Sequence, residues 1–267
     1  MADKYKAPAV KKAFQILKLI SESNKGLRIS ELAKSLGISK GTVHGITAIL
    51  EELGAVKRDT SSKRYELGLT LFELGRMAYS QVDLRVAVRP VMEELMEKVK
   101  ETVFFGVLNG ERTTILDLVE CKHDFKITSP IGTTIPLFAG ATGKALLSVM
   151  DEKDAMMIIK RKGLPRYTDK SITDPEPYIK EIRDACRNGY AVDDEEYISG
   201  VRAVAAPLDW DKYRLAAIWI VGFKMSLDEN KMELLKREIR EAVKAVSHRI
   251  RIQSGLKVEK VNDAVEP

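Results

Sequence analysis

The N-terminal third of the chain is organised around residues 30–54, SELAKSLGISKGTVHGITAILEELG. Ser30 is expected to cap a short helix that runs to Leu36, and Ser39 is expected to cap a longer helix that ends near Leu53. A glycine follows each helix, which is typical of a helix end. Two helices joined by a short turn predict a helix-turn-helix.

The longer helix has one apolar and one polar face. Its apolar residues recur at helical spacing, which predicts a buried stripe made of Val43, Ile46, Leu50 and Leu53. The opposite face is small and polar, as a helix that enters a DNA major groove requires. The residues expected to contact bases or phosphates are Ser39, Lys40, Gly41, Thr42 and His44. A single helical histidine is also commonly a solvated surface residue, so both interpretations of His44 stay open.

A helix over residues 11–21 precedes this pair, and a basic hairpin follows it. Residues 55–58 and 63–67 predict two short strands around a polar turn at 59–62. This order is typical of a winged helix-turn-helix, whose wing contacts the sugar-phosphate backbone. The basic residues expected to do so are Lys57, Arg58, Lys63 and Arg64. Short helix-turn-helix patterns also occur in many helical proteins, and basic hairpins are often only solvated faces.

The positive charge is concentrated in this first segment. The chain of 267 residues has a formal net charge of +5. Residues 1–80 hold 14 Lys and Arg against 8 Asp and Glu, which leaves 30 and 31 for the rest of the chain. We therefore expect a DNA-binding domain, residues 1–68, joined to a larger and nearly neutral domain.

An amphipathic segment links the two domains. Residues 69–83 predict a linker helix, and a second helix follows from Leu84 to about Lys100 with one apolar face. This second helix packs either on a second subunit or on the sheet of its own domain, and both alternatives stay open.

The remaining residues predict an α+β domain over 84–253, in which helices cover an antiparallel sheet. The last helix is expected to begin with a capping box at Ser226, and residues 254–267 are expected to be a disordered tail. The other expected elements are two strands around the Asn109-Gly110 turn, strands at 201–208 and 215–223, and a helix at 175–188.

The stretch Gly140-Ala141-Thr142-Gly143 is expected to lead into a helix that begins near Thr142 or Gly143. Unpaired backbone N–H groups at such a helix start bind an anion when small residues leave them accessible. Tight packing of small residues is the alternative explanation. The stretch is not a phosphate-binding P-loop, because Lys144 is followed by Ala and no hydroxyl is left for magnesium.

The sequence lacks the common signatures of enzymes and of membrane or secreted proteins. It has no G-x-S-x-G or H-E-x-x-H motif and only His44, His123 and His248 as histidines, so we expect no enzyme and no cofactor. Cys121 and His123 form with Asp124 a weak metal-site signal, and a structural loop is the favoured explanation. No run approaches the ~18 apolar residues of a membrane span, and the N-terminus lacks the apolar core of a signal peptide. We expect a cytoplasmic protein with reduced thiols.

Three stretches resemble the IclR family of bacterial transcriptional regulators, in that family's order: residues 36–44, 136–147 and 189–202. The resemblance implies an N-terminal winged helix on DNA, a helical linker used in dimerisation and a C-terminal GAF-like domain that binds a small metabolite. It also implies a homodimer or homotetramer and small carboxylates as effectors. The chain departs from the family at Gly45, where Arg is frequent, and at Ala203, where Cys is frequent.

The resemblance also indicates which residues approach the effector. Asp193, the first acid of the run 193–196, approaches the ligand in the resembling proteins, and Trp219 and Val221 match positions that line the pocket. The full set expected there is Ile135, Gly140, Ala141, Thr142, Asp193, Val201, Ala203, Trp219 and Val221. A solvated acidic loop and core packing of Trp219 are the competing explanations.

Together these patterns predict a ligand-responsive transcriptional regulator. Two recognition helices of a dimer are expected in successive major grooves of a partly palindromic operator, and a small carboxylate-bearing metabolite is expected to switch the binding. The alternative is a metabolite-sensing or enzymatic GAF-like protein without sequence-specific DNA binding.

Overall fold

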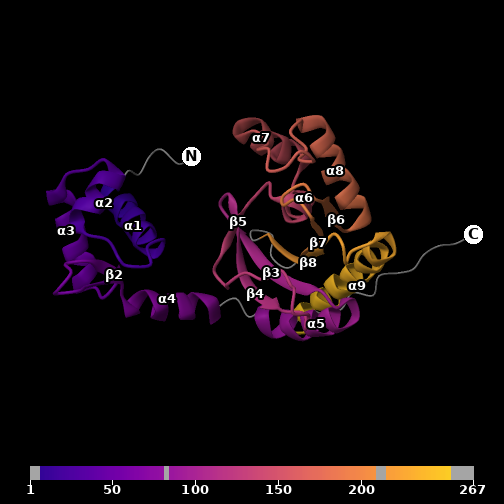
Figure 1. Cartoon of the computed structure of the whole chain (residues 1–267), viewed down its shortest axis with the longest axis horizontal. Helices are drawn as coiled ribbons and strands as arrows, with labels where there is room; N and C mark the ends of the chain where they lie inside the picture. The colour runs from indigo at the N-terminus through magenta and orange to yellow at the C-terminus, as the bar shows by residue number, and fades with distance from the viewer. Residues whose placement is uncertain (1–6, 81–83, 209–214, 254–267) are drawn as a thin grey trace, which may run out of the picture. The chain divides into compact units, whose positions relative to one another are not determined.

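A computed structural model describes residues 7–80, 84–208 and 215–253 of the chain. Backbone packing divides the chain into two compact units, Met1–Asp83 and Leu84–Pro267. Figure 1 shows both units, and each is described below by itself. The expected tail at 254–267 lies outside the described residues.

The N-terminal unit is a three-helix bundle with a two-stranded hairpin. Its core is formed by Ile16, Leu32, Val43, Val56 and Tyr65, and each of these side chains is almost fully buried. The helix-turn-helix and the hairpin expected from the sequence are both confirmed. The elements are α1 (Pro8–Ser21), α2 (Ile29–Leu36), α3 (Lys40–Glu52), β1 (Val56–Arg58), β2 (Tyr65–Leu67) and α4 (Leu69–Ser80).

One of the two expected helix caps in this unit is wrong. The Ser39 hydroxyl accepts the backbone N–H of Thr42 at 3.1 Å, so Ser39 caps α3 as expected. Helix α2 instead begins at Ile29, with Arg28 rather than Ser30 at its N-cap. The backbone N–H of Arg28 donates to the carboxylate of Glu31 at 2.6 Å, as in a capping box. This bond takes the place of the expected serine cap.

The expected buried stripe of α3 is also corrected at its end. Val43 and Leu50 are buried, whereas the Leu53 side chain is 61% exposed. Thr47 takes the remaining core position, where its hydroxyl donates to the carbonyl of Val43 at 2.9 Å. A polar side chain is tolerated there because the helix backbone satisfies its hydrogen bond.

The C-terminal unit is built on one six-stranded antiparallel sheet with the strand order β5-β4-β3-β8-β7-β6. The hairpin at Asn109-Gly110 and the strand pair at 201–223 are confirmed, as is the α+β class. The elements are α5 (Leu84–Val99), β3 (Thr102–Asn109), β4 (Arg112–Val119), β5 (Thr134–Pro136), α6 (Gly140–Leu147), α7 (Glu152–Lys162), α8 (Pro175–Asn188), β6 (Ala191–Asp194), β7 (Val201–Leu208), β8 (Ala216–Phe223) and α9 (Glu229–Gln253).

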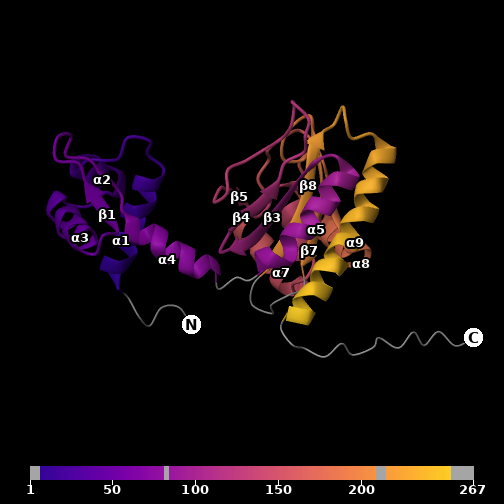
Figure 2. The same ribbon diagram turned by 90° about the horizontal axis from the view of Figure 1, so that it is seen from below.

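Helices cover both faces of this sheet. Helices α6, α7 and α8 gather on one side, and α5 and α9 lie together on the other (Figures 1 and 2). The apolar face of α5 is buried against this sheet and α9, and Arg89 of α5 pairs with Asp117 of β4 at 2.9 Å. The structure thus shows α5 packed on the sheet of its own domain.

Two helix starts in this unit differ from expectation. Helix α6 begins at Gly140, before Thr142, so the whole stretch 140–143 forms its first turn. Helix α9 begins at Glu229, and the Asp228 carboxylate caps it by accepting the N–H of Lys231 at 2.8 Å. The expected Ser226 cap is wrong, because the Ser226 hydroxyl donates to the carbonyl of Phe223.

Candidate DNA interface and ligand sites

The first turn of α3 presents small and flexible groups on its exposed side. Gly41 and Gly45 carry no Cβ and are exposed, which leaves the backbone of the helix accessible. Lys40 and His44 are exposed beside them. The hydroxyls of Ser39 and Thr42 lie 2.9 Å apart and are held by the helix cap. This surface fits a helix that approaches a groove closely.

The hairpin carries three exposed cations and one that is held inside the unit. Lys57 and Lys63 are exposed, and the guanidinium of Arg58 lies 5.7 Å from the centre of the Tyr65 ring. Arg64 is half-buried, where it donates to the carbonyl of Gly26 at 2.8 Å and to Glu31 at 3.0 Å. Arg64 thus ties the hairpin to α2, a role that the basic pattern alone does not reveal.

The start of α6 and the acidic run 193–196 meet in the C-terminal unit. Gly140 has a φ of +57°, and a Cβ added to it would collide with the Asp193 carboxylate. Asp193 is buried and accepts the backbone N–H of Glu196 at 2.6 Å. Burial raises the pKa of Asp193 to about 6. Two residues expected at the effector pocket are therefore adjacent, and Ala141 and Thr142 are buried on the same turn.

The other acids of the run turn to different partners. Asp194 accepts from Arg202 at 2.6 Å, while Glu195 pairs with Lys170 and Lys224, which lower its pKa to about 2. Pairing with lysine and arginine side chains near the surface thus explains the middle of the run, whereas Asp193 is buried and Glu196 pairs with the buried Lys144.

Lys144, which the sequence did not indicate as a functional residue, is buried beside Asp193. The Lys144 side chain on α6 has no exposed surface, and its Nζ atom lies 2.6 Å from the carboxylate of Glu196. Glu181 of α8 is 3.4 Å away. A lysine within the small-residue stretch of α6 could have indicated a buried ion pair. Its partners, Glu181 and Glu196, could not have been identified because they lie far away in the sequence.

The apolar residues of the expected pocket belong to one hydrophobic cluster. Trp219 is 4% exposed and stacks on Phe104, with ring centres 5.5 Å apart. Val201 lies two residues before Ala203 on β7. The pocket residues within the cluster or packed against it are Ile135, Ala141, Ala203, Trp219 and Val221. Core packing of Trp219, the competing explanation, is what this structure shows for that side chain.

Thr113 on β4 is a further polar group in this cluster, and sequence reasoning missed it. The residue is 1% exposed, and its hydroxyl has no hydrogen-bond partner among the residues that the structure describes. It pairs in register with Ile135, and a Cβ added to Gly106 would contact both Thr113 and Trp219. Alternation along a strand does not distinguish a threonine that faces a ligand from one that faces solvent.

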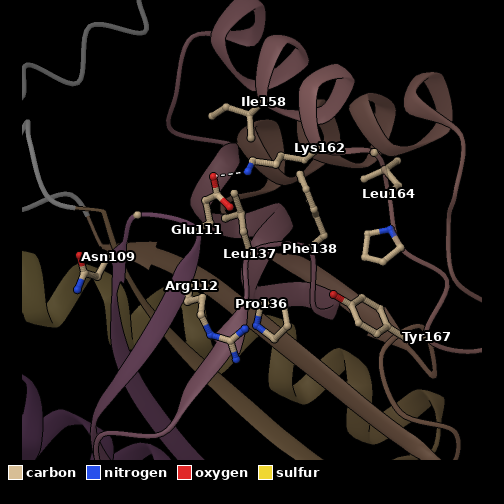
Figure 3. Close-up of a pocket in the computed structure, with 13 residues that line it drawn as sticks. Asn109, Glu111, Arg112, Pro136, Leu137, Phe138, Ile158, Lys162, Leu164 and Tyr167 are labelled. Atoms are coloured by element: carbon tan, nitrogen blue, oxygen red, sulfur yellow. Dashed lines mark ion pairs between the residues drawn. The ribbon is translucent and has the colours of Figure 1, made fainter. Parts of the chain in front are cut away.

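A cavity of about 740 Å³ lies apart from these residues, between the β3–β4 turn, the start of the β5–α6 connection and the end of α7 (Figure 3). Lys162 and Glu111 form an ion pair of 2.5 Å at its edge. None of the nine expected effector residues lines this cavity. Its lining comprises Asn109, Gly110, Glu111, Arg112, Pro136, Leu137, Phe138, Ile158, Lys162, Gly163, Leu164, Pro165 and Tyr167.

The described residues, 7–80, 84–208 and 215–253, contain neither a metal-binding cluster nor a membrane-spanning helix. No group of three or more His, Cys, Asp and Glu side chains there is arranged to hold a metal ion, and Cys121 is buried. No helix in the same ranges has the length and apolar character needed to cross a membrane.

The chain matches two family models that together cover most of its length. One is described as "Bacterial transcriptional regulator IclR C-terminal" and matches residues 77–248, and the other, "IclR helix-turn-helix domain", matches residues 9–60. The HTH-type transcriptional regulator KipR of Bacillus subtilis is 32% identical, over 84% of this chain and 90% of that protein. The transcriptional repressor IclR of Escherichia coli is 31% identical, over 79% and 78%.

Solved structures show the same fold. An IclR transcriptional regulator from Alicyclobacillus acidocaldarius is 26% identical with a TM-score of 0.79, over 92% of this chain and 100% of that one. An IclR homolog complexed with 4-hydroxybenzoate, from Microbacterium hydrocarbonoxydans, is 20% identical with a TM-score of 0.75, over 91% and 99%.

Proposed function

Because the chain belongs to the IclR family of bacterial transcriptional regulators, which bind DNA and carry an effector-binding domain, we propose that it is a cytoplasmic repressor switched by a small carboxylate. The family is one of regulators and not of enzymes. We assign residues 1–68 to DNA binding, 69–83 to the linker and 84–253 to effector binding. The protein acts as a homodimer or homotetramer.

The proposed DNA contacts divide into two classes. Lys40, Thr42 and His44 contact base edges from the first turns of α3, in successive major grooves of a partly palindromic operator. Their surroundings support this role, because the neighbouring glycines permit close approach of the helix. The phosphate contacts come from Ser39, the Gly41 backbone and the exposed wing residues Lys57, Arg58 and Lys63. Arg64, expected to join them, instead holds the wing against α2 through Gly26 and Glu31.

The proposed effector site is carried by one observation, the contact of Asp193 with Gly140 at the start of α6. The backbone N–H groups of this turn favour an anion, and Asp193 already places a carboxylate there. A carboxylate effector must therefore bind next to a neutral Asp193 or displace it. A homolog of the same fold is complexed with 4-hydroxybenzoate, which is a small carboxylate.

Effector binding changes DNA affinity only if the effector prefers one arrangement of the two DNA-binding units. Exposed apolar residues on α4, Leu69, Phe72, Leu74 and Met77, support a role of the linker in joining subunits. We propose that occupancy of the α6 site shifts this arrangement through the linker.

Fluorescence anisotropy tests the proposal. The full chain is titrated onto DNA from upstream of its own gene and onto a shuffled duplex, at several salt concentrations, with and without candidate carboxylates. We expect selective binding to the upstream DNA and a steep dependence on salt. Equal, weak binding to both duplexes would contradict the proposed operator and favour a sensor role.

The variant Thr142→Val separates the two activities. It removes one hydroxyl from the first turn of α6 and nearly preserves the side-chain volume. We expect the response to the carboxylate to be lost while DNA binding without ligand persists. If the response survives in Thr142→Val, the effector site lies elsewhere.

A further inference from the structure

The cavity beside the β3–β4 turn has a cationic end. Arg112 lines it and uses Nε and Nη2 to hold the hydroxyl and carbonyl of Thr134, at 2.6 and 2.8 Å. A guanidinium has five N–H donors, so these two bonds leave donors for a ligand. Lys162 is neutralised by Glu111, which leaves Arg112 as the net charge of this end. The arrangement favours an anionic group.

The body of the cavity is apolar. Phe138, Ile158 and Leu164 line it together with Pro136, and in Figure 3 the Tyr167 hydroxyl points toward Pro136. A cavity of about 740 Å³ is within the usual size range of small-molecule sites, which are mostly apolar with a few polar groups.

A small recess shares Phe138, Leu164, Pro165 and Tyr167 with the cavity and also contains Tyr178 and Glu196. Its volume of about 10 Å³ accommodates roughly one oxygen atom.

Tyr178 lines this recess and has an unused hydrogen-bond donor. The residue is 3% exposed, and its hydroxyl has no partner within the described ranges of the chain. Burial and the nearby charge of Glu196 raise the pKa of this hydroxyl, so it stays a neutral donor. A buried donor without an acceptor is unfavourable, and a ligand that supplies the acceptor gains from that contact.

We propose that the cavity and its recess form a second ligand site, separate from the α6 site, for a small carboxylic acid with an apolar body and a terminal hydroxyl. The carboxylate accepts hydrogen bonds from Arg112, and the apolar body packs on Phe138 and Leu164. The hydroxyl enters the recess, where it accepts from Tyr178 and donates to Glu196.

The orientation follows from charge. One oxygen of the Glu196 carboxylate accepts from Lys144 at 2.6 Å, and a carboxylate has further acceptor capacity. The reverse orientation would place the ligand carboxylate next to Glu196, where two like charges repel. A hydroxyl is both donor and acceptor, so it suits both groups of the recess.

Isothermal titration calorimetry on the full chain tests this site with three probes. The probe 8-hydroxyoctanoate carries both polar ends, octanoate lacks the hydroxyl, and 1,8-octanediol lacks the carboxylate. We expect 8-hydroxyoctanoate to bind more tightly than either of the other two.

Two variants remove the two ends of the site separately. Arg112→Gln should lower the affinity for 8-hydroxyoctanoate and for octanoate about tenfold, because a hydrogen bond to a charged group is lost. The affinity for the diol should not change. Tyr178→Phe keeps the buried ring and should lower the affinity for 8-hydroxyoctanoate and for the diol about fivefold. The affinity for octanoate should stay the same. The charge-matched control Arg187→Gln, on exposed α8 surface, should leave all three affinities unchanged.

Three results would overturn the second site. These are an absence of 8-hydroxyoctanoate binding, binding that neither Arg112→Gln nor Tyr178→Phe weakens, and binding that is lost in Thr142→Val. The last result would assign the probe to the α6 site instead. Loss of carboxylate-responsive DNA binding in Thr142→Val together with normal 8-hydroxyoctanoate binding would support both sites.

Discussion

The Asp193 carboxylate on β6 lies directly against the backbone of Gly140, the first residue of α6. A Cβ at position 140 would collide with Oδ2 of Asp193, and Gly140 also has a φ of +57°. This contact joins the edge strand β6 to the helix start where we place the effector. It makes position 140 specific for glycine for two independent reasons, backbone conformation and space.

The variant Gly140→Ala is expected to lower the free energy of unfolding by roughly 2–4 kcal/mol, because it adds a steric collision to the strain of a left-handed residue. Gly110→Ala is the matched control, since Gly110 has a φ of +63° with no neighbouring atom in the way. It should cost only about 1 kcal/mol. Urea denaturation measures both, and equal losses would show that Asp193 exerts no steric effect on position 140.

Asp193 should make the stability of the protein depend on pH. Its pKa rises from 3.8 to about 6 on folding, so the folded state binds more protons than the unfolded state between these values. The stabilising effect of the protonated form is complete below about pH 4 and is lost as the pH rises through about 6. Asp193→Asn should therefore raise the free energy of unfolding at pH 7.5 by about 2 kcal/mol and leave it unchanged at pH 4. Urea unfolding at both pH values decides this, and a gain of equal size at the two would exclude titration of Asp193 as the cause.

The same group should affect the proposed effector. A carboxylate that binds at the α6 start is repelled by an ionised Asp193, so its affinity should fall by about tenfold between pH 5.5 and pH 7.5. Calorimetric titrations across this range give the affinities. In Asp193→Asn the pH dependence should disappear, and its persistence there would point to a different titrating group.

The ion pair between Lys144 and Glu196 is expected to be important because it is buried. Lys144→Met leaves the Glu196 carboxylate without its cation and should cost about 3 kcal/mol of stability. The double variant Lys144→Met/Glu196→Gln should recover at least half of that loss. Lys122→Met breaks an exposed pair with Glu97 and should have little effect. A double variant as unstable as Lys144→Met alone would argue against the pairing.

Base and phosphate contacts should differ in their dependence on DNA sequence and salt. His44→Ala should reduce the preference for operator over shuffled DNA. Lys57→Gln should lower the affinity for both duplexes equally and reduce by about one the slope of log affinity against log salt concentration. Lys244→Gln on α9 serves as the charge-matched control, since it is exposed and lies in the effector-binding unit. Anisotropy titrations at several salt concentrations distinguish the classes, and a loss of selectivity in Lys57→Gln would reverse the assignment.

The helices and strands themselves could largely be predicted from the sequence. The Ser39 cap and the Asn109-Gly110 turn depend on residues close together in the chain. The errors were also local: Ser30 and Ser226 are good capping residues, yet Arg28 and Asp228 hold the N-cap positions. Capping depends on the backbone conformation of the residue, which the residue type alone does not determine.

The sequence also predicted which residues belong near the effector, but not how they interact. Asp193 and Gly140 were both expected there, whereas their direct contact depends on where β6 lies beside α6. Lys144 pairs with Glu181 and Glu196 only because α6, α8 and the loop after β6 pack together. The hydroxyls of Thr113 and Tyr178, which have no partner in the described part of the chain, could not be recognised from the sequence.

The amino-acid sequence by itself thus determined the order of elements, the basic character of the winged helix and the family, because periodicity, caps, turns and net charge act over a few residues or need no coordinates. Tertiary structure decided the raised pKa of Asp193, the burial of Lys144 and the cavity at Arg112 and Tyr167. These properties depend on distances between groups far apart in the chain, and desolvation and charge pairing become strong only when packing excludes water.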